Sequence, residues 1–224
     1  EAWMHNGIYN LDFISSDVST CYRKLNLSNN ESALVFDIGY NGTVISVVKR
    51  DKNVFRSIAN KYINGIGGRV FCNMIYSDME EQSKIQYDSF AQIIQVQNID
   101  RVSRMIMECL STKEYVVTSV PFTDYIYSIS RKEFNGMINK PLEESLNECL
   151  DCIKDSGNSM GGIKKILLTG GCSQIPYIEK ILKIFFNTGN SEKKDVITPK
   201  CTEDALYAAC KGAFTVQQTS ILKF

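Results

Sequence analysis

An acidic residue at the end of an apolar run is the first feature of the sequence with chemical potential. Asp37 follows the run 33–36 and precedes a short turn that contains Gly39 and Gly42. A glycine-bearing turn presents backbone N–H groups to a phosphate, and a carboxylate beside it orients a metal-bound water. An ordinary hairpin with a well-formed turn has the same residues, so this motif alone leaves both interpretations open.

A glycine pair, Gly170-Gly171, is the second candidate. It follows the run 166–169, and Pro176 beyond it indicates the start of a helix. A strand that stops at two glycines lets the backbone approach a ligand closely, because no Cβ stands in the way. Strand-to-helix turns without a ligand also use glycine. Both candidate turns have functional meaning only if they meet at one cleft mouth.

A Cys-x-x-Cys pair, Cys149 and Cys152, has the spacing of redox motifs and half zinc sites. The pair lies inside a helical pattern, no second pair follows, and the only histidine, His5, is distant in sequence. We therefore expect helix thiols, packed or exposed, no metal site and no catalytic role for His5.

These motifs are positioned by alternating strands and helices. Ser130, followed by Glu133 three residues later, predicts a capping box at the start of a helix. Apolar periodicity predicts strands at 33–39, 43–48, 54–59 and 163–169, two short strands within 115–130, and helices at 1–13, within 70–110, and at 131–155, 176–186 and 203–214. Segments 14–32 and 187–200 are polar and predict loops. The pattern is α/β with mixed strand directions.

Composition excludes several classes of protein. Lys plus Arg and Asp plus Glu are both 25, which argues against a nucleic-acid partner. Since no apolar run reaches the roughly 18 residues of a membrane span, we expect no membrane partner. Eight scattered cysteines favour reduced thiols and a cytoplasmic location. Glycosylation acceptor patterns at Asn26, Asn30 and Asn41 leave the endoplasmic reticulum lumen as an alternative.

The motifs, taken in order, resemble the second lobe of the nucleotide-binding domain of heat-shock protein 70 (DnaK-type) chaperones. The resemblance covers nearly all of the chain, and the segments that carry it are 8–12, 33–48, 63–75, 125–134, 166–182 and 203–213. Actin-like and bacterial filament ATPases share the glycine-pair turn, but they lack counterparts of 8–12 and 125–134.

The resemblance implies an α/β actin-like ATPase (ribonuclease H-like) lobe: a mixed sheet with flanking helices plus an inserted smaller α+β subdomain. Segments 1–68 and 141–224 would form the sheet subdomain and 69–140 the insertion. A first lobe, with the other phosphate loop and the hydrolytic lysine, would precede residue 1. The intact protein would take ATP or ADP with magnesium, whereas this fragment would require no cofactor and would not hydrolyse ATP alone.

The resemblance also implies which residues would touch nucleotide. Asp37 is the candidate for orienting metal-bound water, and no residue is assigned a firm catalytic role. The nucleotide-binding candidates are Asp37, Gly39, Gly42, Thr43, Gly68, Arg104, Ser111, Gly170, Gly171 and Gln174.

The phosphate turn departs from the family pattern Asp-Leu-Gly-Gly-Gly-Thr-x-Asp. Asp37 and Gly39 match, but Tyr40 and Asn41 replace glycines and Gly42 replaces the threonine. A tyrosine side chain crowds a turn that is meant to touch phosphate.

The second acid of that pattern is missing, because Val44 stands in its place. A one-residue shift lets Thr43 replace the family threonine without restoring the acid. The loss removes one ligand for metal-bound water.

The adenosine helix departs as well. Aligned on Leu110 and Ser111, the family's Lys-Arg pair falls on Met107 and Glu108, and its glutamate falls on Arg104. Ser111 is retained.

Beyond the glycine pair, the adenine-stacking arginine becomes Gln174, and the family acid after the Gly-Gly start becomes Arg69. A guanidinium stacked on a base contributes about 1–3 kcal/mol. Backbone contacts from Gly170 and Gly171 would remain available to a nucleotide.

These departures predict a divergent chaperone or co-chaperone with weakened nucleotide binding and lost hydrolysis, of a kind kept for its partners. The expected partners are a J-protein, a nucleotide exchange factor or a ribosome-associated protein, besides the missing first lobe and a substrate-binding domain. The alternatives are a fragment of an active ATP-dependent chaperone and an actin-like filament protein.

Overall fold

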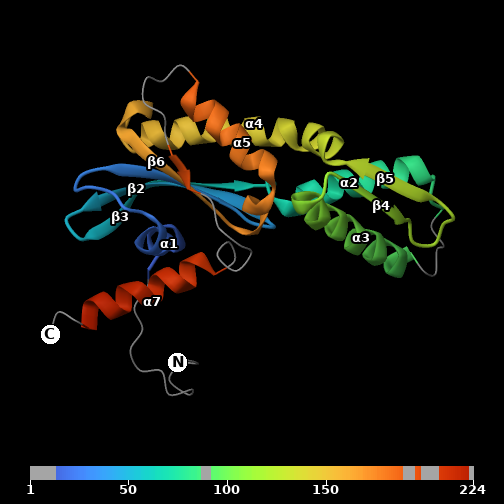
Figure 1. The fold of residues 1–224 in the computed structure, drawn as a ribbon, viewed down its shortest axis with the longest axis horizontal. Coiled ribbons are helices and arrows are strands. Elements are labelled where there is room, and N and C mark those ends of the chain that lie inside the picture. Colours follow the sequence, from blue (N-terminus) through green and yellow to red (C-terminus); the bar gives the residue numbers. More distant parts are fainter. Residues whose placement is uncertain (1–13, 87–91, 189–194, 198–206, 222–224) are drawn as a thin grey trace.

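The computed structural model describes residues 14–86, 92–188, 195–197 and 207–221 (Figure 1). Its larger part is a five-stranded sheet in the order β3-β2-β1-β6-β7. The strands are β1 (Ser32–Ile38), β2 (Gly42–Asp51), β3 (Val54–Asn64), β6 (Ile163–Thr169) and β7 (Asp195–Ile197). β1 pairs antiparallel with β2 and parallel with β6. The predicted α/β class with mixed strand directions is confirmed.

Burial explains the residue pattern of the strands. β1 lies centrally and is covered on both faces, so its apolar run 33–36 is continuous. β3 lies at the edge and alternates between more and less exposed residues. It extends beyond the predicted 54–59 because its pairing with β2 continues to Asn64.

Helices cover both faces of the sheet (Figure 1). α4 (Arg131–Asp155) and α5 (Pro176–Asn187) cover the face of Leu34 and Phe36. α1 (Ser16–Lys24) covers the face of Ala33 and Val35, and α7 (Ala208–Ile221) packs on α1.

A smaller unit extends from one end of the sheet (Figure 1). It comprises α2 (Gly68–Ser83), α3 (Gln92–Thr112) and a two-stranded antiparallel sheet of β4 (Tyr115–Ser119) and β5 (Ile126–Ser130). One face of that hairpin packs on α2 and α3 through Val116, Tyr127 and Ile129.

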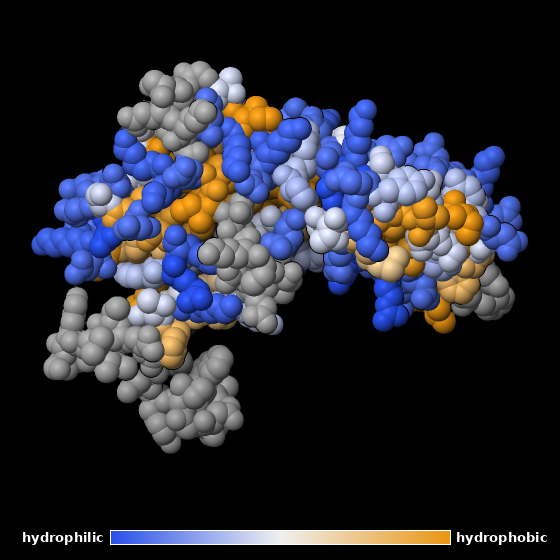
Figure 2. Space-filling model, in the orientation of Figure 1, coloured by the Kyte–Doolittle hydropathy of each residue, from blue (hydrophilic) through white to orange (hydrophobic). Residues whose placement is uncertain are grey.

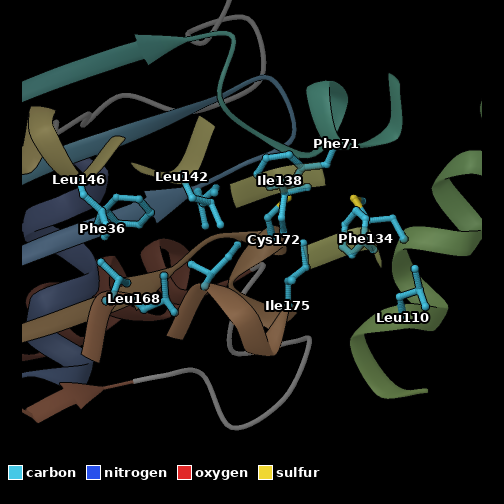
Figure 3. Close-up of a cluster of buried hydrophobic side chains, with 14 of the residues drawn as sticks. Phe36, Phe71, Leu110, Phe134, Ile138, Leu142, Leu146, Leu168, Cys172 and Ile175 are labelled. Carbon is cyan, nitrogen blue, oxygen red and sulfur yellow. The ribbon is translucent and has the colours of Figure 1, made fainter. Parts of the chain in front are cut away.

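One hydrophobic core joins the two units. Figure 3 shows it running from Phe36 and Leu168 of the sheet, with Leu146 of α4 packed on them, to Phe134 near the start of α4 and Leu110 of the smaller unit. α4 is continuous through residues 140 and 141, with Pro141 inside it, and contacts both units. The division into 1–68 with 141–224 and 69–140 stays a prediction.

The capping box predicted at the start of α4 is confirmed. The Glu133 N–H donates to the Ser130 hydroxyl at 3.2 Å, and the Ser130 N–H donates to the Glu133 carboxylate at 2.8 Å. Two N–H groups at the helix start thereby gain partners.

Two loop predictions were wrong. Segment 14–32 contains α1, and segment 187–200 contains β7. α1 has a polar sequence, yet Asp17, Ser19 and Thr20 are buried because each finds a hydrogen-bond partner. The predicted helix 1–13 and the start of the helix 203–214 lie outside the described residues.

The cysteine prediction is confirmed for Cys149 and Cys152, which are buried on α4. Burial raises the pKa of Cys152 to about 11, so the thiol form persists at neutral pH. Among the described residues no cluster of three or more His, Cys, Asp or Glu side chains has the spacing to hold a metal, and no helix is long and apolar enough for a bilayer. His5 lies outside the described residues.

Candidate functional site

The two glycine turns meet at one edge of the large sheet. β1 and β6 are parallel, and Asp37 near the end of β1 pairs with Thr169 at the end of β6. The turns 39–41 and 170–174 therefore leave the sheet side by side. The second of them contains a short 3-10 helix, η3 (Gly171–Gln174). A further one, η2 (Met160–Gly162), precedes β6.

Gly170 is required by close contact between these turns. Its φ is +86°, and a Cβ at this position would lie 2.4 Å from the Ile38 carbonyl oxygen and 2.5 Å from Asp37 Oδ1. Both the conformation and the contact exclude a side chain. The glycine therefore lets the turn close over the end of β1.

A row of residues crosses the sheet at this edge. Asp37 pairs with Thr169 on one side and Val44 on the other, and Val44 pairs with Tyr62. Asp37 is thus the single carboxylate of this row. Burial raises its pKa, and the charge of Asp17 raises it further.

The first turn is closed by its own backbone and by the start of α2. The Gly39 N–H donates to the Gly42 carbonyl at 3.0 Å. The Gly68 N–H donates to the Gly39 carbonyl at 3.0 Å, and the Arg69 N–H to the Tyr40 carbonyl at 2.7 Å. These three N–H groups, of the kind that cradle phosphate, are therefore bonded to carbonyls of the chain.

The side chain of Tyr40, a residue of this turn, contacts the start of α2 and Arg104 of α3. A Cβ at Gly68 would lie 3.1 Å from Tyr40 Cδ2, so the ring rests against the start of α2. The Arg104 guanidinium carbon lies 4.4 Å from the centroid of the ring, which is cation–π geometry. Hydrogen bonding with the Tyr40 hydroxyl raises the pKa of Arg104. Tyr40 of the sheet unit and Arg104 of the smaller unit are thus in direct contact, and we call this pair the clasp.

Three sulfur-containing side chains, those of Cys72, Met107 and Cys172, pack near Gly68 and Tyr40. Cys172 Sγ lies 3.4 Å from the Gly39 carbonyl oxygen, and Cys72 Sγ lies 3.8 Å from Met107 Sδ. All three residues are buried. Burial raises the pKa of Cys72 and of Cys172 to about 12, so both are neutral thiols.

The hydroxyls of the candidate site are used within the fold. The Thr43 hydroxyl is buried and donates to the Ile66 carbonyl at 2.7 Å. The Ser111 hydroxyl donates to the Met107 carbonyl at 3.3 Å, one turn back on α3. Gly42 is covered by the Tyr62 ring, since a Cβ there would lie 2.7 Å from the Tyr62 hydroxyl oxygen.

Comparison with known proteins decides the family. The Hsp70 protein family model matches residues 18–202. The chain belongs to the Hsp70 family. It therefore has the family's actin-like ATPase fold, as the mixed sheet with flanking helices indicates.

The curated relatives are Hsp70-type chaperones at low identity. Chaperone protein HscA of Buchnera aphidicola subsp. Baizongia pistaciae is 25% identical over 165 residues, which are 72% of this chain and 31% of the relative. The HscA homolog of Actinobacillus pleuropneumoniae serotype 5b is 24% identical over 156 residues, 68% of this chain and 24% of the relative. HscA of Xenorhabdus nematophila is 22% identical over 158 residues, with the same coverage. The chain spans about a quarter to a third of the length of these relatives.

The structure brings most of the expected Hsp70 nucleotide residues to one place. The turn residues, the start of α2 and the glycine pair are linked by hydrogen bonds and close contacts, and Arg104 joins them through Tyr40. Ser111 follows Arg104 two turns later on α3, and Gln174 ends η3 in a half-buried position. Gly171 is exposed at the start of η3.

Sequence reasoning missed the pairing of Tyr40 with Arg104. It identified each as a departure from the Hsp70 pattern but treated the two separately. The available signal was that a glycine had become aromatic while a glutamate had become a cation, which is a complementary pair.

Hsp70 domains bind ATP or ADP with magnesium. The contacts at this edge do not match that ligand: one carboxylate stands where the family pattern has two, an aromatic ring stands on the turn, and the nearby N–H groups are bonded to the chain's own carbonyls.

Proposed function

We propose that the chain is the second lobe of the nucleotide-binding domain of a divergent Hsp70-type chaperone or co-chaperone, with weakened nucleotide binding and lost hydrolysis. The observation that carries the proposal is the Tyr40–Arg104 clasp. Its ring rests on Gly68, and the guanidinium covers the ring at 4.4 Å. The clasp therefore fills the space beside the phosphate turn with the chain's own side chains.

Energetics support weakened binding. A nucleotide that used the Gly68 and Arg69 N–H groups would first break two hydrogen bonds. Each contributes about 0.5–1.5 kcal/mol net. The arginine that stacks on adenine in the family is Gln174, a loss of about 1–3 kcal/mol. At their lower limits these terms total about 2 kcal/mol, which corresponds to a loss of about thirtyfold in affinity.

Hydrolysis has less support than binding. Asp37 lacks a second acid, because its neighbour in the row is Val44. Burial raises the Asp37 pKa, which disfavours the carboxylate that a magnesium-bound water needs. The role proposed for the protein is therefore partner binding.

We propose a J-protein, a nucleotide exchange factor or a ribosome-associated protein as the partner class, together with a first lobe and a substrate-binding domain. The proposal follows the family and the chaperone names of the relatives. We propose a cytoplasmic location. The three HscA relatives are bacterial, which gives the endoplasmic reticulum alternative no support.

Isothermal titration of the full-length protein with ATP-magnesium tests the proposal. We expect no micromolar binding and no hydrolysis. The double substitution Tyr40→Gly with Arg104→Glu restores the family residues, and it should tighten binding by about tenfold or more as the clasp is removed. Arg101→Glu, exposed on the same helix, is the matched control and should change nothing. Micromolar affinity with measurable turnover in the unmodified protein would favour an active ATP-dependent chaperone and end the proposal.

A further inference from the structure

α2 presents two different faces. Phe71, Cys72, Ile75 and Met79 are buried in the core. The other face lines a groove of about 480 Å³ whose remaining wall is Met137 of α4. Figure 1 shows α2 beside β5 and the first turns of α4, and Figure 2 shows the surface of the molecule in the same orientation. The residues of α2 in the groove are Val70, Asn73, Met74, Ser77, Asp78 and Glu81.

The spacing of those residues forms one continuous stripe. They follow i, i+3, i+4, i+7, i+8 and i+11, which is a single helix face over three turns. At 1.5 Å per residue the stripe is about 16 Å long. Val70, Met74 and Met137 are half-buried and apolar, while Asn73 and Ser77 are polar. The groove therefore has the length and the apolar floor of a seat for a short helix.

The two ends of the groove differ in charge. Asp78 and Glu81 line its distal end, and Glu80 adds a third carboxylate to the same end of α2. Glu133 is also close to this end. Burial is the main cause of the raised pKa of Tyr127, and the nearby Asp78 and Glu133 carboxylates raise that pKa further. Lys84 is the base beside this end, at the C-cap of α2. The distal end of the groove therefore carries net negative charge.

The charges of α2 also oppose its own dipole. The first turn holds Arg69 and no acid, and the last turn holds Glu80 and Glu81 and no base. Each charge at the wrong end of the helix dipole lowers the stability of α2. Among the described residues neither glutamate forms an ion pair that would offset this cost. A basic partner at this end would supply the missing compensation.

We propose that the groove between α2 and α4 docks an amphipathic helix of a partner protein, with its apolar face on Val70, Met74 and Met137 and its basic end beside Asp78 and Glu81. Methionine floors adapt to different apolar side chains. The groove begins at Val70, two residues after Gly68, but none of its residues is a nucleotide-binding candidate, so the proposal does not depend on weakened nucleotide binding.

A synthetic peptide is the probe. It is an amphipathic helix of about 14 residues, with leucines on one face and three lysines at one end, and its acidic twin carries glutamates instead of lysines. Methyl-labelled methionine NMR of the 224-residue chain gives the readout, since the groove contains Met74 and Met137 while Met105 on α3 is an exposed reference. We expect the basic peptide to shift the Met74 and Met137 signals, leave Met105 unchanged, and bind more tightly than its twin.

Charge reversal tests the direction of the groove. Glu81→Lys should weaken the basic peptide by about three- to tenfold, since an attraction becomes a repulsion at a partly exposed site. Asp195→Lys changes the net charge by the same amount at an exposed residue of β7, and it should have no effect on peptide binding. Glu81 is exposed, so its substitution leaves the fold intact.

Five results would overturn the proposal, and the first four come from the peptide experiments. The first is that the basic peptide does not bind at concentrations up to about 1 mM, and the second is that the acidic twin binds equally well. The third is that only the Met105 signal shifts. The fourth is that Glu81→Lys and Asp195→Lys change peptide binding equally. If the Met74 and Met137 signals change with chain concentration alone, a second copy covers the groove and the proposed occupant is wrong.

Discussion

The clasp between Tyr40 and Arg104 makes a quantitative prediction. The guanidinium carbon lies 4.4 Å from the ring centroid, inside the range in which a cation is attracted to an aromatic face. Arg104 is exposed and Tyr40 is half-buried, so the interaction should contribute about 0.5–1 kcal/mol to the free energy of unfolding. This value lies below that of a fully desolvated pair.

A double-mutant cycle isolates that value. The variants are Tyr40→Leu, Arg104→Met and the pair, each unfolded in urea and followed by circular dichroism. The pKa of Arg104 is raised mainly by Tyr40 and further by Asp100. Arg104→Met alone therefore removes the attraction to Asp100 as well as the contact with Tyr40. The coupling energy of the cycle cancels that contribution, and we expect about 0.5–1 kcal/mol.

Arg101→Met combined with Tyr40→Leu is the matched control, because Arg101 is exposed on the same helix. It should show no coupling with Tyr40. A coupling below about 0.2 kcal/mol for Arg104, or an equal one for Arg101, refutes the clasp and with it the main support for the proposed function.

Three further outcomes are expected. Gly170→Ala should destabilise the chain by about 2–5 kcal/mol through strain and overlap, whereas Gly136→Ala, with no atom within 4 Å of the new Cβ, should stabilise α4 by about 0.5–1 kcal/mol in urea unfolding. The raised pKa of Asp37, caused by burial and then by Asp17, means that its carboxylate costs stability above the folded pKa. Asp37→Asn should therefore raise the urea midpoint at pH 7, with the gain vanishing as pH falls below about 3.9, the unfolded value. Cys210 is exposed and should react with Ellman's reagent in the native chain; equal rates at the buried thiols would contradict the packing of Cys21, Cys72, Cys149, Cys152 and Cys172.

Local rules made much of the fold predictable. The continuous apolar runs of β1 and β6 follow from burial on both faces of a sheet, and Ser130 with Glu133 marks the start of α4. The glycine pair was identifiable as a place where the backbone makes a close approach, predicted toward a ligand, and the structure shows that Gly170 approaches the Ile38 carbonyl of β1. Each of these features depends on neighbours in sequence or on one simple packing rule.

Polar residues with distant partners were not predictable. α1 is polar in sequence and was expected to be a loop. Its Asp17 is buried because the Ser57 hydroxyl on β3 donates to it at 2.7 Å. Burial alone would raise the Asp17 pKa, but hydrogen bonds from Ser15, Ser57 and the Val18 N–H lower it. Nothing in the local pattern specifies these partners.

Apart from α1 and β7, the sequence by itself determined the main strands and helices, the two glycine turns and the residues that depart from the Hsp70 pattern, because periodicity, caps and motifs act over a few positions. Only the tertiary structure decided that Tyr40 and Arg104 face each other, that the Thr43 hydroxyl is taken by Ile66, and that one stripe of α2 lies open beside Met137. These relations join distant segments, and their geometry arises only when the sheet and the smaller unit pack on a shared core.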